Sequence, residues 1–157
     1  YQNFVMDDKT MYPIYEEIVK RNMILMFHGG YDPGFEGMDS CYANRCAALA
    51  RDFKGAKIIL AHMGDVWDNR LSMEYLIGTD VYFDVSMATL HMPRLQVEQL
   101  IAAHGADKFL YATDSPWSDG FSVQRTIESL HITEANKEKI FYKNAVKLLG
   151  IKEGDVE

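Results

Sequence analysis

Three short apolar runs constrain this chain most, because each of them leads into a side chain that can bind a metal or carry a proton. The runs are Met23–Phe27 before His28, Lys57–Ala61 before His62, and Phe109–Ala112 before Asp114. None of them alternates regularly between apolar and polar residues, which is typical of strands in a parallel sheet that helices cover. Pro116 ends the third run, because proline has no N–H to donate to a sheet. We therefore expect two imidazoles and a carboxylate at the carboxyl ends of buried strands.

Helical patterns separate these strands. A fourth strand is expected over Val81–Val85, with Asp84 and Ser86 at its end. The four strands begin near residues 23, 57, 81 and 108, a spacing close to the ~30 residues of one β/α unit. Alternating elements of this kind form a parallel sheet with right-handed crossovers, so the expected class is α/β. No G-x-G-x-x-G follows a strand, so a dinucleotide-binding fold has no support.

The expected helices follow from apolar spacing and from capping residues. Thr10 is expected to cap a first helix, whose apolar face is formed by Met11, Ile14, Tyr15, Ile18 and Val19. Further helices are expected over 42–53, 65–77, 93–104 and 122–130. Thr133 is expected to cap the last helix and Gly150 to end it.

Composition limits the class of protein and its partners. The chain has 157 residues, 48% of them hydrophobic, which is enough for one domain with a sizeable core. Its formal net charge of −7 and its lack of a basic run weigh against nucleic acid or an anionic membrane as a partner. No apolar run approaches the roughly 20 residues of a membrane span, and no signal peptide is visible. Two cysteines do not make a disulfide framework, so a reducing, cytoplasmic setting is expected.

The strand ends carry the chemistry that the pattern predicts. In a β/α barrel the catalytic groups lie at the carboxyl ends of the strands, and imidazole and carboxylate are ligands of catalytic divalent metals. A single histidine at a strand end is more often structural. Asp114 could instead form an Asx turn before Pro116, and turn chemistry is an equal alternative for Asp84 and Ser86. All four expected strands, however, end in polar side chains. This agreement favours a metal site at His28, His62 and Asp114 over a chance arrangement.

Ser86, at the end of its strand, and residues in the following loops are candidates for substrate contact. Tyr31 and Phe35 lie in a glycine-rich loop, which is either a substrate lid or a connector. Trp117 follows Asp114 closely and is a better candidate for a pocket wall than Trp67. His91 is either a substrate contact or an ordinary solvated histidine. Two further pairs are expected to be structural: Cys41 and Cys46, as buried small residues rather than a zinc half-site, and His104 and His131.

Four motifs together resemble the amidohydrolase superfamily, in its amidohydrolase-related branch that includes enzymes of the aminocarboxymuconate-semialdehyde decarboxylase type. They are FHGG at 27–30, LAHMG at 60–64, YATDSPW at 111–117 and NAVKLLGI at 144–151. The resemblance implies a (β/α)₈ TIM barrel that holds one or two divalent metals, zinc foremost and manganese as the alternative.

The resemblance also implies roles for single residues. His28 is the metal ligand on the family's fifth strand, and Asp114 is the eighth-strand aspartate, which binds metal and acts as a general base. His62, on the sixth strand, orients or polarises the metal-bound water or substrate in one-metal members, and is a ligand in two-metal relatives. The chemistry is consistent, because a metal lowers the pKa of bound water and a nearby carboxylate can take the proton.

The sequence departs from the family in lacking the H-x-H pair of the first strand, and it holds four strands where eight are expected. A complete barrel needs ~250 residues. The resemblance therefore implies that the chain is the C-terminal half of a barrel, with its last four β/α units and a C-terminal helix, and that its natural start lies upstream of Tyr1. We expect open edges at the first and last strands, and either self-association as a homo-oligomer or a missing N-terminal half. Weak metal binding and little activity of the chain alone should follow.

The leading function is a metal-dependent hydrolase or decarboxylase of a small carboxylated or cyclic compound. A metal-dependent nuclease of the TatD type also has an aspartate followed by Ser-Pro, but the acidic balance and the HMG after the sixth strand argue against it. The third possibility is a non-catalytic half-barrel that serves as an assembly module.

Overall fold

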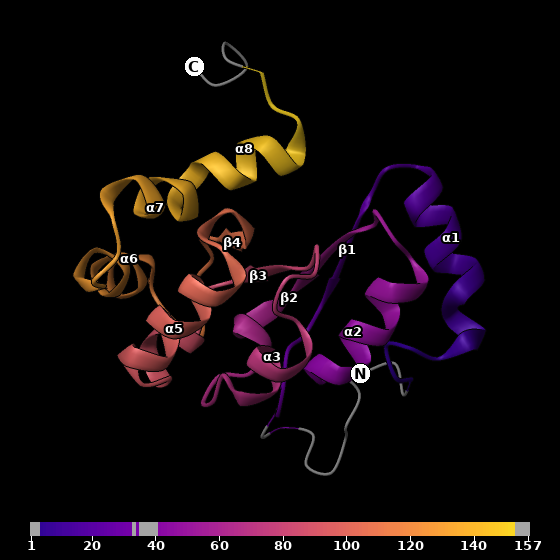
Figure 1. Cartoon of the computed structure of the whole chain (residues 1–157), viewed down its shortest axis with the longest axis horizontal. Helices are drawn as coiled ribbons and strands as arrows, with labels where there is room; N and C mark the ends of the chain where they lie inside the picture. The colour runs from indigo at the N-terminus through magenta and orange to yellow at the C-terminus, as the bar shows by residue number, and fades with distance from the viewer. Residues whose placement is uncertain (1–3, 33, 35–40, 153–157) are drawn as a thin grey trace.

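A computed structural model describes residues 4–32, 34 and 41–152, and these form a four-stranded parallel sheet with helices packed around it (Figure 1). The strands lie side by side in chain order: β1 (Ile24–Phe27), β2 (Lys57–Leu60), β3 (Tyr82–Asp84) and β4 (Phe109–Leu110). All three pairings are parallel. The expected parallel α/β arrangement is therefore confirmed.

Eight helices join and flank the strands in the described part of the chain: α1 (Tyr12–Lys20), α2 (Ala43–Asp52), α3 (Arg70–Tyr75), α4 (Ala88–His91), α5 (Arg94–His104), α6 (Gly120–Ser129), α7 (Glu134–Glu138) and α8 (Asn144–Leu149). A π-helical turn over Lys139–Lys143 links α7 to α8. The Thr133 side chain caps α7 as expected, by accepting a hydrogen bond from the Asn136 N–H. None of the helices in the described ranges is long and apolar enough to cross a membrane.

Two predicted helix starts are wrong, and aspartates explain both. Asp8, not Thr10, caps the first helical segment, because its carboxylate accepts the Thr10 N–H at 2.9 Å. The helix expected over 65–77 begins only at Arg70. Asp65 and Asp68 accept the N–H groups two residues further on, at Trp67 and Arg70, and these local bonds compete with helix formation. Ile14, expected on the apolar face of α1, is exposed.

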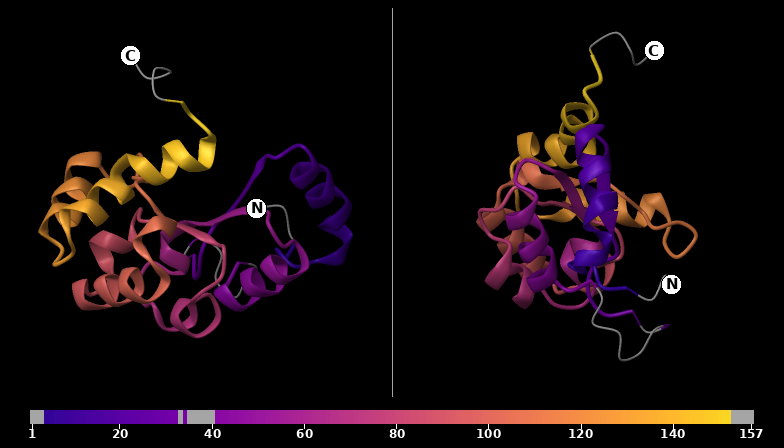
Figure 2. Two further views of the ribbon diagram at one scale, coloured as in Figure 1. Left: turned by 45° about the horizontal axis from the view of Figure 1, so that its top comes forward. Right: turned by 90° about the vertical axis from the view of Figure 1, so that its right-hand side faces the viewer.

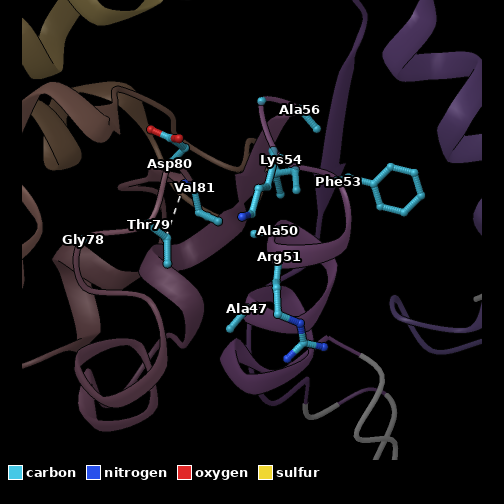
Figure 3. A pocket seen from close by; sticks show the side chains of 12 residues that line it. Ala47, Ala50, Arg51, Phe53, Lys54, Ala56, Gly78, Thr79, Asp80 and Val81 are labelled. Atoms are coloured by element: carbon cyan, nitrogen blue, oxygen red, sulfur yellow. Dashed lines mark hydrogen bonds between the residues drawn. The ribbon is translucent and has the colours of Figure 1, made fainter.

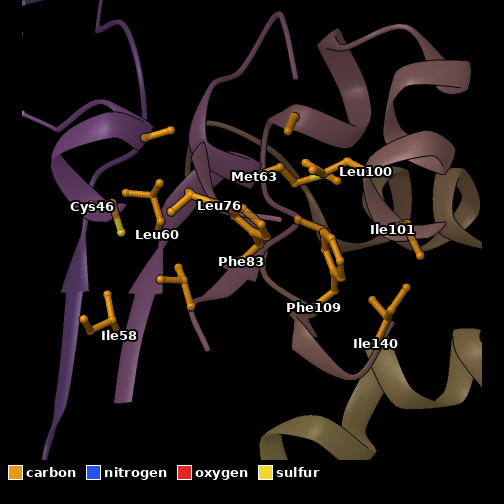
Figure 4. Close-up of a cluster of buried hydrophobic side chains, with 14 of the residues drawn as sticks. Cys46, Ile58, Leu60, Met63, Leu76, Phe83, Leu100, Ile101, Phe109 and Ile140 are labelled. Atoms are coloured by element: carbon orange, nitrogen blue, oxygen red, sulfur yellow. The ribbon is translucent and has the colours of Figure 1, made fainter. Parts of the chain in front are cut away.

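The outer face of the sheet carries the main hydrophobic core. Alternate strand residues point to this face, among them Leu25, Ile58, Leu60, Phe83 and Phe109. They pack against buried side chains of α1, α2, α5 and α6, and Figure 4 shows Phe83 and Phe109 at the centre of the cluster. The helices of the chain therefore complete this face by themselves.

The inner face is covered much less. Four residues of this face form a small cluster with Ala145 and Leu148 of α8: Ile24, Ile59, Tyr82 and Leu110. The left view of Figure 2 shows α8, in yellow, lying apart from α1, in indigo. Met26, further along β1, is 58% exposed. An apolar hollow of about 210 Å³ remains between this face and α8.

The edge of β4 is not open, contrary to expectation. The Asn144 side-chain amide donates to the Phe109 carbonyl at 2.7 Å, and the Tyr111 N–H donates to the Ile140 carbonyl at 2.8 Å. Both strand groups point away from β3, whose Val85 N–H bonds to the intervening carbonyl of Leu110. The C-terminal helices thus occupy this edge, while β1 has no strand on its outer side within the described ranges.

Candidate functional site

The four predicted strand ends meet at one pocket of about 300 Å³ on the inner face. The two-residue period of a strand places its inner-facing residues in line, so Met26 precedes His28, Asp84 precedes Ser86, and Ala112 precedes Asp114. The lining residues are Met26, Phe27, His28, Ala61, His62, Asp84, Ser86, Ala112 and Asp114. The structure therefore brings together the two imidazoles and the carboxylate that the sequence placed at strand ends.

His28 follows β1 directly and forms one wall of this pocket. Its ring lies edge-on to that of His62, with ring centroids 5.0 Å apart. The residue is exposed, but partial desolvation lowers the pKa of its imidazole, and the neighbouring His62 lowers it further. The His28 imidazole is therefore neutral at neutral pH, and the neutral form is the one that binds metals.

His62 is buried and its backbone adopts an uncommon conformation. Both His62 and Met63 have φ between 55° and 58°, in the left-handed region that costs a non-glycine residue about 1–2 kcal/mol. The Asp84 carboxylate accepts the His62 N–H at 3.0 Å, and Ser86 Oγ lies 2.9 Å from His62 Nδ1. These bonds from the end of β3 hold the turn after β2 in place.

Glycines let the first two strand ends approach each other. A Cβ on Gly29 would lie 2.0 Å from the Ala61 carbonyl oxygen, and one on Gly64, whose φ is +88°, would lie 2.1 Å from Ser72 Oγ. A side chain at Gly29 would push the two loops apart, and one at Gly64 would collide with Ser72 of α3. The FHGG and LAHMG motifs are therefore the two halves of one packed contact.

Asp114 ends the fourth strand segment with a positive φ of 58°. The turn after it is closed by the backbone, because the Trp117 N–H donates to the Asp114 carbonyl at 2.9 Å. Within the described residues the carboxylate accepts no hydrogen bond, so an Asx turn does not account for it. Its side chain is exposed and lines the pocket.

Three of the loop residues predicted to contact substrate, Tyr31, His91 and Trp117, do not line this pocket. Tyr31 is exposed, and its N–H bonds to Asp65 at 3.4 Å. Trp117 is highly exposed, and the His91 ring packs at a tilt against Trp67, with ring centroids 4.9 Å apart. Phe35 lies outside the described residues. Tyr31, His91 and Trp117 follow β1, β3 and β4 respectively, so they belong to the same end of the sheet as the pocket.

Asp84 plays a part that the strand-end pattern did not predict. It accepts the Ser86 N–H two residues on, as the turn alternative predicted, but it is also buried and accepts the His62 N–H from the adjacent strand end. The signal was present in the two-residue period, which places Asp84 on the same face as Ser86 and directs both inwards.

The donor atoms of the pocket do not make a complete metal site by themselves. Within the parts of the chain that the structure describes, no three histidine, cysteine, aspartate or glutamate side chains converge closely enough to hold an ion.

Cys46 is fully buried, and burial raises the pKa of its thiol to about 12, so it remains a protonated core residue. This agrees with the structural role expected for it.

A larger cavity of about 370 Å³ lies at the opposite end of the sheet, between the end of α2 and the turn before β3 (Figure 3). Its charged lining residues are Arg51, Lys54 and Asp80, of which Asp80 pairs with Lys108. It contains neither an imidazole nor a nucleophilic thiol. The strand-end pocket is therefore the candidate active site.

Residues 2–151 match the family model described as amidohydrolase. Among curated proteins, no sequence matches the chain significantly. Solved structures share its fold. The chain is 19% identical to 2,6-dihydroxybenzoate decarboxylase from Rhizobium, with a TM-score of 0.69, and the alignment covers 94% of this chain and 57% of that one.

Two further structures agree. A dihydroxybenzoic acid decarboxylase from a Polaromonas species, with bound manganese and the inhibitor 2-nitroresorcinol, is 20% identical with a TM-score of 0.70, over 98% of this chain and 58% of that one. A TIM-barrel protein from Bordetella bronchiseptica is 21% identical with a TM-score of 0.75, over 94% and 52%. The chain thus spans little more than half the length of these structures, and its four β/α units correspond to part of a TIM barrel. Together with the family match over nearly its whole length, this shows that the chain belongs to the amidohydrolase family.

Proposed function

We propose that a barrel containing this chain is a metal-dependent decarboxylase of a small carboxylated aromatic compound. The observation that carries the proposal is the single pocket into which strand ends bring His28, His62 and Asp114. The decarboxylases of dihydroxybenzoates that share the fold favour this reaction and this substrate class. The family description favours hydrolysis at the same pocket as the second candidate, since one site can polarise either kind of substrate.

The chain's own groups fit these reactions. Asp114 has a carboxylate with no hydrogen bond from the described residues, so it is free to exchange a proton with a substrate. His62 is rigidly held beside it in the lining of the pocket, as a polarising group. In decarboxylation the bond between ring and carboxylate breaks, carbon dioxide leaves, and the ring carbon takes up one proton. A group like Asp114 would deliver that proton.

A divalent metal fits the pocket in the kind of donor but not in their number. His28 and Asp114 would hold the ion, with His62 as a further ligand in a two-metal site. When bound, the ion would act as a Lewis acid on a substrate oxygen. Zinc is the metal that the sequence predicts, and manganese is the metal in the Polaromonas decarboxylase. The remaining ligands must come from outside the residues described.

Completion of the barrel is the second part of the proposal. The related structures are nearly twice as long as the matched region, and β1 offers an edge without a strand partner in the described ranges. Four further β/α units, on the same polypeptide or on another chain, would pair there and cover the inner face. The isolated chain should then be inactive and should self-associate. A cytoplasmic location remains a prediction.

Metal content and turnover test both parts. The protein extended by the preceding β/α units should hold about one ion per chain and release carbon dioxide from 2,6-dihydroxybenzoate, whereas the 157-residue chain should do neither. His28→Ala and Asp114→Ala should lose the metal. His131→Ala is the matched control, because this exposed histidine lies outside the pocket.

Other outcomes would select other functions. Hydrolysis of amides or lactones without decarboxylation would favour the hydrolase. Cleavage of DNA would favour the metal-dependent nuclease. An extended protein that binds no metal would leave only an assembly module.

A further inference from the structure

The pocket contains a buried chain of hydrogen bonds, from His62 through Ser86 to Asp84, whose proton positions the proposed function leaves unspecified. We propose that Asp84 and Ser86 are positioning residues that hold His62 as the neutral Nδ1–H tautomer, so that Nε2 carries the lone pair offered to the pocket. The inference rests on the proposed function for its chemical purpose, but its geometry stands independently. It also limits which substrate groups His62 can meet.

The direction of the bonds follows from counting protons at Asp84. A single oxygen, Oδ1, lies 3.0 Å from the His62 nitrogen, 3.0 Å from the Ser86 nitrogen and 2.5 Å from Ser86 Oγ. Backbone N–H groups can only donate, so both lone-pair directions of this oxygen already receive protons. A proton on Oδ1 would face these donors. The proton between Asp84 and Ser86 therefore belongs to the serine hydroxyl, and Asp84 Oδ1 accepts it.

The same count fixes the tautomer of His62. A serine hydroxyl has one proton, and Ser86 gives it to Asp84. Its oxygen then has only lone pairs to offer His62 Nδ1 at 2.9 Å, so Nδ1 must carry the hydrogen. In a neutral ring the other nitrogen, Nε2, is then an acceptor, and it is the nitrogen that remains for a ligand.

Burial makes this arrangement independent of solvent. The exposed fractions of Asp84, Ser86 and His62 are 3%, 1% and 6%. Water is largely excluded, so it cannot replace either partner and reverse the bonds. The hydrogen bond that the His62 N–H donates to Asp84 also stabilises the left-handed backbone at His62. One carboxylate therefore holds the backbone directly and the ring through Ser86.

The tautomer narrows what the pocket can bind at this point. A lone pair on Nε2 accepts a hydrogen bond from a hydroxyl or coordinates a cation, whereas it repels a carboxylate oxygen. We therefore infer that a substrate hydroxyl or a divalent metal, rather than a carboxylate, meets His62. Ser86, whose hydroxyl is used in full, acts through His62 rather than by contacting substrate.

The 157-residue chain itself contains an internal reference for the test. His104 is also buried, and its Nε2 lies 2.8 Å from the Val81 carbonyl, which can only accept. His104 must therefore be the opposite, Nε2–H, tautomer, and its Nδ1 has no partner among the described residues. One spectrum should show two buried histidines with reversed proton positions.

The experiment is a long-range ¹H–¹⁵N correlation spectrum of histidine-labelled protein at a pH of about 8.5, well above the ordinary pKa of histidine. His62→Gln and His104→Gln assign the signals. In the wild type, His62 should show a protonated Nδ1 and an unprotonated Nε2, and His104 the reverse. Ser86→Ala should raise the population of the Nε2–H form of His62 severalfold. Thr89→Ala, which removes a nearby buried hydroxyl bonded to the Val85 carbonyl, should leave the His62 pattern unchanged.

A wild-type His62 in the Nε2–H form would overturn the proposal, even if Ser86→Ala did not fold. A folded Ser86→Ala protein with an unaltered pattern would overturn the role of Ser86. Neither readout needs metal or turnover. An extended protein that is inactive and metal-free would therefore remove the proposed function without touching this inference, and an active one with Nε2–H His62 would do the opposite.

Discussion

The two faces of the sheet differ in how much of each is covered by the helices of this chain. On the outer face, side chains such as Phe83 and Phe109 are fully buried under the chain's own helices. On the inner face, α8 covers only part of the sheet, and Met26 is mostly exposed. The outer face therefore supplies most of the buried core, while the inner face holds the candidate active site. Stability and chemistry are separated by the pleat of the strands.

Substitution of matched apolar residues on the two faces should give the largest difference. Phe83→Ala should lower the free energy of unfolding by about 3–5 kcal/mol, because it leaves a cavity in a closed core. Met26→Ala should change it by less than about 0.5 kcal/mol, because the side chain is exposed on the inner face. Urea unfolding of both variants measures the contrast. Equal losses would mean that the inner face is closed in solution.

The loops at the carboxyl ends of β1 and β2 are packed tightly against each other. Gly29→Ala should cost about 3 kcal/mol, because the added methyl meets the Ala61 backbone. Gly55→Ala is the control, since it has a positive φ but open space around it, and should cost about 1 kcal/mol from backbone strain alone. If the two losses in unfolding free energy were the same, the packed contact between the loops would be disproved.

A smaller effect should appear in the pH dependence of the outer core. Burial lowers the pKa of His104, whose ring makes edge contacts with both Phe83 and Phe109. The unfolded chain then binds a proton at a higher pH than the folded one. Stability from this group is present above a pH of about 6.5 and falls as the pH drops below that value.

The comparison variant for this effect is His104→Gln, which cannot titrate. Its free energy of unfolding, measured between pH 8 and pH 5, should fall less than that of the wild type. His131→Ala, at an exposed position, should follow the wild-type curve. A wild-type curve no steeper than that of His104→Gln would show that the pKa of His104 is the same in the folded and unfolded states.

Much of this arrangement could be read from local patterns. The apolar runs, their spacing and the polar residues that follow them predicted a parallel sheet with His28, His62 and Asp114 at one edge. Helices α2, α5 and α6 lie where apolar spacing placed them, because amphipathic periodicity is a property of neighbouring residues. The first turn of α3 was predicted wrongly because two aspartates bond their own backbone, a local competition that apolar spacing does not record.

Other features depend on partners far away in the chain. The left-handed turn at His62 exists because Asp84, 22 residues later, accepts its N–H. The closed edge of β4 exists because Asn144, 35 residues after Phe109, donates to the strand. Single-sequence patterns contain no information on such pairs, since each partner would be equally compatible with a turn or a solvated surface.

The sequence by itself determined the order of the elements, the face on which each strand residue lies, and the residue types gathered at the strand ends. Periodicity is set by backbone geometry, so it needs no tertiary contact. Only the tertiary structure decided that Ser86 donates its hydroxyl proton to Asp84. It also decided that Gly29 must lack a side chain, and that the C-terminal helices cover the β4 edge of the sheet. These are matters of distance between segments, and distances arise only once the helices have packed the sheet.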